Sequence, residues 1–259
     1  MGSQTGKVAI VTGGSRGIGR AIARRLADEG GKVVIAARDR TTLDATAREI
    51  ANAGGQATAV PMDLRSPDAP VALAQAALDT YGAIDIVVNN AGATKRGDFQ
   101  DLTDEDWSDG FALKFFAAVR LVRAAWPHLK ARRGAVLNII GVGGRTPGAE
   151  FTIGGSVNGA SLTFTKALAD VGVRDGVRVN AINPGYIRTD RLSGWLEASA
   201  RKQGISFEAA ADDMVRLTKT VRLGAPEDVA NLAAFVLSAE GTFLHGALLD
   251  LDGGMTKSV

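Results

Sequence analysis

Short apolar runs alternate with longer helical patterns along the whole of this 259-residue chain. The runs are continuous in Val, Ile, Leu and Ala, without regular alternation with polar residues, so they are predicted to be strands buried on both faces. Strands of this kind, joined by right-handed helical crossovers, form doubly wound sheets. The pattern predicts one α/β domain over residues 1–259, with a seven-stranded parallel sheet and helices on both faces. The expected strands lie at about residues 7–13, 32–38, 57–64, 84–92, 134–141, 177–185 and 246–254.

Helical patterns fill the intervals between these runs. The spacing predicts helices at about 18–30, 41–52, 66–81, 103–131 and 154–170, followed by a helical pair. The segment from Arg191 to Thr220 is rich in Gly and Ala and follows the sixth strand. We expect this segment, at about 191–220, to form a lid over the carboxyl edge of the sheet.

Composition excludes several classes of function. The chain has no cysteine, which excludes a disulfide, a thiol nucleophile or a Cys-ligated metal. The two histidines, His128 and His245, are far apart, so no metal site is expected. The net charge is +2 and the basic residues are scattered, which argues against nucleic acid as a partner. The apolar stretches are too short to span a bilayer, and the N-terminal residues "MGSQTGKVAIVTGG" lack a signal-peptide apolar region, so a cytoplasmic protein without a membrane partner is expected.

A glycine-rich stretch, "TGGSRGIG" at 12–19, lies between the first strand and the first helix. Its glycines allow a tight turn and a close approach of the backbone to a pyrophosphate, and they direct the helix N-terminus at that group. Such a stretch is strong evidence for a dinucleotide only in this strand–turn–helix context. The loop residues predicted to contact the cofactor are Gly13, Ser15, Arg16, Gly17, Ile18 and Gly19.

The end of the second strand bears on the choice of cofactor. NAD-binding sheets usually place an acidic residue there for the ribose 2′-hydroxyl, but this strand ends at Ala37 and is followed by Arg38. Two guanidinium groups, those of Arg16 and Arg38, favour a 2′-phosphate and therefore NADP(H) over NAD(H). In the alternative, both arginines are surface charges and Asp39 is the acidic residue of an NAD site.

Together with this loop, "MDL" at 62–64, "NNAG" at 89–92, "NPG" at 183–185 followed by Thr189, and "LDGG" at 251–254 resemble the motifs of the classical short-chain dehydrogenase/reductase superfamily over almost the whole chain. The resemblance implies a Rossmann fold, a nicotinamide cofactor, an alcohol or ketone as small-molecule substrate, and a homotetramer or homodimer. It also implies that Asp63 and Leu64 border the adenine and that Asn90, Ala91 and Gly92 line the ribose. The nicotinamide end would be held by Pro184, Gly185, Ile187 and Thr189.

The chain departs from this family at the catalytic positions. The family uses an Asn, a Ser, a Tyr and a Lys, and counting from the motifs places Lys114, Gly141, Gly154 and Asn158 at these positions. Two hydroxyl groups are therefore missing, and we expect a hole where they would be. Such a hole would suit a bulkier substrate or one that supplies its own acid.

The Lys and the Asn of the family have exchanged helices in this chain. If the two helices face each other as in the family, the Lys114 ammonium lies near the ribose hydroxyls with Asn158 beside it. The alternative is drift after loss of function, with Lys114 extending to solvent. Lys114 is one candidate acid, with its pKa lowered by burial and by the positive nicotinamide ring. Tyr186 is the other candidate acid, although it is also explained as a packing residue over the cofactor.

Two classes of function follow. The first is an NADP(H)-binding oxidoreductase with an atypical active site, in which Lys114, Asn158 and Tyr186 are the predicted catalytic residues of a carbonyl–alcohol hydride transfer. The second is a non-catalytic NADP(H)-binding protein with a structural or sensory role. Arg145, Glu150 and Arg191 could line the pocket and suit an acidic substrate, or could be surface charges.

Overall fold

The computed structural model describes residues 2–257 and contains the predicted seven-stranded parallel sheet. The order of the strands is β3-β2-β1-β4-β5-β6-β7, and every neighbouring pair is parallel. The strand order reverses between β1 and β4, and ligands of such sheets bind outside the carboxyl ends of the strands at this point. The strands are β1 (Val8–Thr12), β2 (Lys32–Ala37), β3 (Gln56–Pro61), β4 (Ile86–Asn89), β5 (Ala135–Ile139), β6 (Arg178–Pro184) and β7 (Leu248–Leu251).

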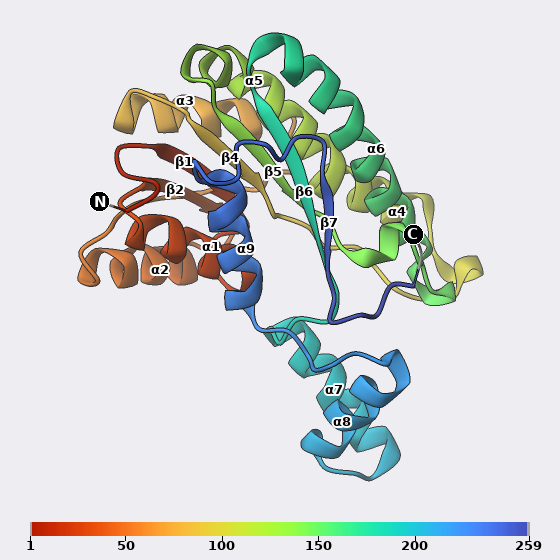
Figure 1. Cartoon of the computed structure of the whole chain (residues 1–259). Helices are drawn as coiled ribbons and strands as arrows, with labels where there is room; N and C mark the ends of the chain where they lie inside the picture. Colours follow the sequence, from red (N-terminus) through yellow and green to blue (C-terminus); the bar gives the residue numbers. More distant parts are fainter. Residues whose placement is uncertain (1, 258–259) are drawn as a thin grey trace.

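Helices cover both faces of the sheet, as Figure 1 shows. One apolar core joins the sheet to α1, α2 and α9, and a second core on the other face joins it to α3, α5 and α6. The central strands β1 and β5 are buried along their whole length, as expected for strands covered on both faces. The helices are α1 (Gly17–Asp28), α2 (Arg40–Asn52), α3 (Ala69–Tyr81), α4 (Asp104–Phe111), α5 (Ala117–Arg132), α6 (Thr152–Asp175), α7 (Asp190–Gln203), α8 (Phe207–Thr218) and α9 (Pro226–Leu237).

The long helix expected at 103–131 is not uniform. It begins with a capping box, in which the Thr103 hydroxyl accepts from the Asp106 amide and the Asp106 carboxylate accepts from the Thr103 amide. Between α4 and α5 the residues Ala112–Phe116 form a π-helical turn. Turns of this type occur mostly as single insertions in α-helices, frequently at functional sites. Lys114 lies at the centre of this turn.

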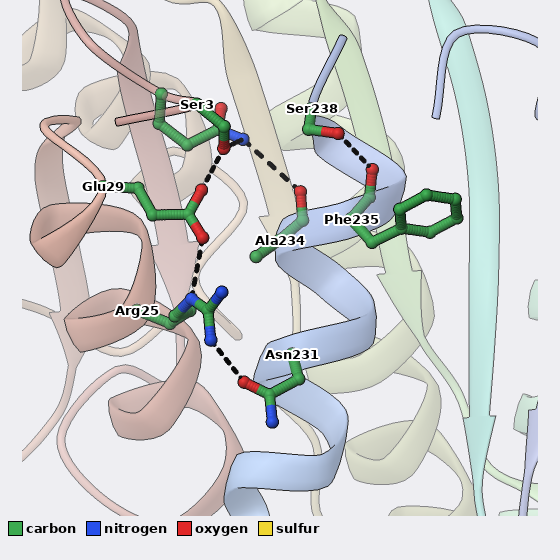
Figure 2. A network of polar contacts seen from close by, with 8 residues as sticks. Ser3, Arg25, Glu29, Asn231, Ala234, Phe235 and Ser238 are labelled. Carbon is green, nitrogen blue, oxygen red and sulfur yellow. Dashed lines mark hydrogen bonds and ion pairs between the residues drawn. The ribbon is translucent and has the colours of Figure 1, made fainter. Parts of the chain in front are cut away.

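The N-terminal segment and α9 are held together by polar contacts beside α1 (Figure 2). Arg25 donates to Glu29 at 2.7 Å and to Asn231 Oδ1 of α9 at 2.5 Å, while Ser3 donates to Glu29. The buried side chain of Gln4 donates to the carbonyl oxygen of Ala234. These contacts join the start of the chain to α9, a helix that the sequence pattern did not single out.

Helices α7 and α8 project from the carboxyl end of the sheet (Figure 1). They occupy most of the segment expected to be a lid and bury an apolar cluster of their own, centred on Leu196, Ala211 and Met214. Within residues 2–257, no helix is long and apolar enough to cross a membrane.

Candidate active site

The glycine-rich turn lies at the reversal point of the sheet and is fixed by the residues that follow β4. The Asn90 side-chain amide donates to the carbonyl oxygens of Thr12 and Gly13, at 2.9 and 3.2 Å. The Thr12 hydroxyl accepts from the backbone amides of Asn90 and Ala91. The predicted cofactor residues after β1 and after β4 are therefore in direct contact.

Glycine is required at several positions of this turn for steric reasons. Gly13 and Gly17 have positive φ angles of 67° and 54°, which favour glycine. A Cβ atom at Gly19 would lie 2.2 Å from the carbonyl oxygen of Gly13. The first turn of α1 contains no acidic residue. The loop and the helix N-terminus are thus arranged as an anion site suited to a pyrophosphate.

The acidic residue considered for an NAD site is already engaged. Asp39 caps α2, where its carboxylate accepts from the Thr42 amide at 2.7 Å, and this hydrogen bond holds the pKa of Asp39 below its usual value. The side chains of Arg16 and Arg38 are exposed beside it. The backbone carbonyl oxygen of Ser15 accepts a hydrogen bond from the Thr46 hydroxyl of α2.

The other predicted cofactor residues lie along the same carboxyl edge. Asp63 is exposed and paired with Arg65 at 3.3 Å, and Leu64 is buried in the core beneath it. Ile187, after β6, forms an isolated bridge with Gly224. A Cβ atom at Gly17 would lie 3.1 Å from the methyl group of Thr189, so the loop after β6 meets the loop after β1. The remaining positions on this edge are Ile18, Gly92, Pro184 and Gly185.

Lys114 and Asn158 are in direct contact across the two helices. The Lys114 ammonium donates to Asn158 Oδ1 at 2.6 Å and to the carbonyl oxygen of Ile140 at 2.6 Å. Asn158 is only 2% exposed, and its amide nitrogen lies 3.4 Å from the carbonyl oxygen of Gly141, to which it donates. The ammonium is therefore turned inward to the end of β5, where Asn158 and Ile140 hold it.

Burial and, to a smaller extent, the positive charge of Arg191 together lower the pKa of Lys114 from 10.5 to about 7. The side chain as a whole keeps some exposed surface, whereas its ammonium is withdrawn from water. An ammonium has three N–H donors, and two of those in Lys114 have protein acceptors. The third has no acceptor among residues 2–257, and a pKa near neutrality suits proton transfer in either direction.

The hole expected at Gly154 is filled, so that part of the expectation is wrong, whereas a Cβ atom at Gly141 would meet nothing closer than Asn158 Nδ2 at 3.3 Å. The ring of Phe151 lies against Gly154: a Cβ atom there would be 2.0 Å from Phe151 Cε2. The other edge of the ring meets Gly143, where a Cβ atom would be 2.7 Å away. Arg96 covers this ring, with its guanidinium carbon 4.2 Å from the ring centroid. An aromatic side chain from the preceding turn thus occupies the start of the space into which a side chain at 154 would extend.

Arg191 connects the start of α7 to the loop after β4. Its guanidinium donates to the carbonyl oxygen of Gly92 at 2.8 Å. A Cβ atom at Gly92 would in turn lie 2.9 Å from Lys114 Cδ. The segment expected to be a lid therefore reaches the site through Arg191, next to the backbone that borders Lys114.

Three other candidate residues, Tyr186, Arg145 and Glu150, make contacts away from the Lys114 ammonium. The Tyr186 ring packs with the apolar cluster of α7 and α8. Arg145 is paired with Asp250 at 3.4 Å. Glu150 is exposed, and its carbonyl oxygen accepts from the Gly97 amide, which brings the loop of Arg96 next to Phe151.

Two small cavities border Lys114 on the core side. Each has a volume of about 10 Å³, and their walls include Ala91, Ala118 and Asn89. This is room for about one water molecule and excludes an organic substrate. A substrate must therefore approach Lys114 from the side of the loops. In the part of the chain that the structure describes, no cluster of three or more His, Asp or Glu side chains is placed to hold a metal ion.

Comparison with known proteins agrees with this architecture. The family model for short chain dehydrogenase matches residues 7–199. An uncharacterized oxidoreductase of Mycobacterium tuberculosis is 37% identical over 256 residues, covering 96% of this chain and 92% of its own, and the oxidoreductase UcpA of Escherichia coli is 34% identical, covering 99% and 97%. The crystal structure of L-sorbose reductase from Gluconobacter frateurii, complexed with NADPH and L-sorbose, superposes with a TM-score of 0.95 at 32% identity, covering 98% of each chain. The chain is therefore a member of the short-chain dehydrogenase family.

Proposed function

We propose that this protein is an NADP(H)-dependent oxidoreductase that interconverts a carbonyl compound and an alcohol, with Lys114 as the proton donor and acceptor. The observation that carries the proposal is the position of the Lys114 ammonium. It is desolvated at the carboxyl end of β5, held by Asn158 and Ile140, and has one N–H left for a ligand.

The residues at the reversal point of the sheet fit a dinucleotide. The turn of Gly13 and Gly17, together with the N-terminus of α1, suits the pyrophosphate. When bound, the nicotinamide supplies or accepts the hydride. Asn90 holds the turn in shape, and Thr189 lies against it from the loop after β6.

Lys114 performs the proton transfer in this proposal. In the reduction direction it donates its third proton to the developing alkoxide oxygen, and in the oxidation direction the neutral amine accepts the hydroxyl proton. Asn158 orients the amine by accepting a hydrogen bond from another of its N–H groups. Phe151 excludes water from the position where the family has its hydroxyl group.

The preference for NADP(H) is argued from charge. Arg16 and Arg38 are exposed at the end of β2, and the nearby carboxylate of Asp39 is committed to capping α2. Similar proteins solved with NADPH, among them the L-sorbose reductase above, support this assignment.

Replacing these arginines should weaken NADPH selectively. Arg38→Ala and Arg16→Ala are each expected to raise the Kd of NADPH by about tenfold or more, because each removes a charged hydrogen bond to the 2′-phosphate. The Kd of NADH, which lacks that phosphate, should change little. Fluorescence titration measures both constants, and Arg48→Ala on the exposed face of α2 is the control. Equal losses for the two cofactors would contradict the assignment.

The function itself is tested by absorbance at the NADPH band, under steady-state and stopped-flow conditions. Purified protein is titrated with NADPH and then offered ketones, aldehydes, quinones and enones. Oxidation of NADPH that disappears in Lys114→Ala but persists in Tyr186→Phe supports the proposal, and the reverse result would assign the acid to Tyr186.

Tight NADPH binding without turnover would favour the second candidate, a non-catalytic cofactor-binding protein. That candidate is supported by the loss of both family hydroxyls and by the Phe151 ring beside Gly154.

A further inference from the structure

We infer that the substrate of this site carries a carboxylate, and that Arg96 and Arg191 bind it. The inference rests on the proposed function, because only an enzyme has a substrate. Binding of an anion at this site can nevertheless be measured separately. It specifies the compound as a carbonyl acid or the corresponding hydroxy acid.

Four cationic side chains surround the approach to the site. Lys114 lies at the base of the site, and Arg191 lies next to it, donating to the carbonyl oxygen of Gly92. Arg96 lies over the Phe151 ring, and Arg16 is part of the glycine-rich turn. Among residues 2–257 no carboxylate lies within 4.0 Å of any of the four cationic groups. Lys95, the cation next to Arg96 in the sequence, is by contrast paired with Asp106.

The four charges act on one another. Desolvation and the charges of Arg16 and Arg96 lower the pKa of Arg191, and Arg191 contributes to lowering the pKa of Lys114. Like charges gathered without a counter-charge raise the energy of the folded protein and attract anions. A bound anion would relieve this repulsion.

Binding of the cofactor would neutralise only some of these four cationic side chains. Arg16 is assigned to its phosphate, and Arg191 lies within electrostatic range of Arg16. Arg96 is on the other side, stacked on the ring that lies against Gly154, and therefore on the substrate side. Arg191 has one N–H committed to Gly92, and its other N–H donors have no acceptor among residues 2–257.

Chemistry favours a carboxylate in this position. A guanidinium binds a carboxylate through two parallel hydrogen bonds, and the contact with Phe151, 4.2 Å from the Arg96 guanidinium carbon to the ring centroid, holds Arg96 at this side of the site. The carbonyl group next to the carboxylate would then be directed toward the free N–H of Lys114.

The test compares acids with neutral analogues on NADPH-loaded protein. A set of 2-oxo acids and their methyl esters is assayed for turnover, and malonate is used as a non-reacting anion in calorimetric titrations. We expect kcat/KM to be at least about tenfold higher for the acids than for the esters. Arg96→Gln and Arg191→Gln should each lower kcat/KM for the acids, and malonate affinity, by about 10- to 100-fold. The esters should be nearly unaffected, and Lys95→Gln, next to Arg96, is the matched control for loss of a charge.

The outcomes separate this inference from the proposed function. Malonate binding that needs both arginines, without turnover of any compound, would support the anion site and contradict the enzymatic function. Turnover of neutral ketones, with no preference for acids and no effect of either arginine, would overturn the inference and leave the function standing. Absence of malonate binding together with absence of turnover would overturn both. Equal losses of NADPH and malonate affinity in both variants would assign the arginines to the cofactor phosphates and overturn the inference.

Discussion

Replacing Lys114 by glutamine should lower kcat by about 10²- to 10⁴-fold, the usual contribution of a general acid. Glutamine retains a hydrogen-bond donor for Asn158 Oδ1 but has no proton to transfer. NADPH affinity should fall far less than kcat, since the phosphate contacts are on other elements. Steady-state kinetics and NADPH titration measure the two effects. The control is Lys166→Gln, which changes an exposed lysine on α6 about two turns beyond Asn158.

The pH profile gives an independent check of the same assignment. The pKa of Lys114 is lowered to about 7, so the protonated donor is lost as the pH rises through that value. The kcat/KM of reduction should therefore decline above about pH 7, whereas that of alcohol oxidation, which needs the neutral amine, should rise. Both transitions should be absent from the residual activity of Lys114→Gln. A wild-type profile that is flat across neutral pH would argue against Lys114 as the acid.

Restoring the family tyrosine at position 154 should destabilise the protein rather than repair it. A Cβ atom there would be 2.0 Å from the Phe151 ring, so Gly154→Tyr forces the ring and its neighbours to move. Overpacking of this kind costs about 1–3 kcal/mol. We expect the loss in the free energy of unfolding in urea denaturation.

A double-mutant cycle identifies the cause of that loss. Phe151→Ala removes the ring, so Gly154→Tyr should cost at least about 1 kcal/mol less in this background than in the wild type. Gly194→Tyr is the control, because it is also a glycine within a helix and a Cβ atom there meets nothing within 4 Å. A Gly154→Tyr protein as stable as the wild type, with no coupling to position 151, would contradict the role given to Phe151.

The sheet could be predicted from the sequence because its strands are buried on both faces and therefore appear as continuous apolar runs. The strand ends agree to within a few residues, as for β2 at Lys32–Ala37. The family resemblance placed Lys114 and Asn158 on facing helices but left open whether Lys114 extends to solvent, and only the structure shows that the two side chains are in contact. The helix α9 was harder, because Ala-rich sequence such as "NLAAFVL" gives little amphipathic signal.

The filled space beside Gly154 could not be predicted from the family positions alone. Phe151 is outside the motif, and its effect depends on the turn η4 (Ala149–Phe151), which directs the ring back over α6. One signal was present: Phe151 precedes Gly154 by three residues, the spacing at which a large side chain can cover a small one on a helix. Arg96 was missed because only the three-dimensional fold brings its loop beside Phe151.

The hydrogen bond from Arg191 to Gly92 links the position of α7 to the protonation of Lys114. Arg191 is on the first turn of α7, and its charge is one of the causes that lower the pKa of Lys114. A swing of α7 that carries Arg191 away from Gly92 would remove this repulsion and raise the affinity of Lys114 for its proton. By reciprocity, protonation of Lys114 favours the outward position of the helix. Arg191 thereby couples the position of the first turn of α7 to the proton affinity of Lys114.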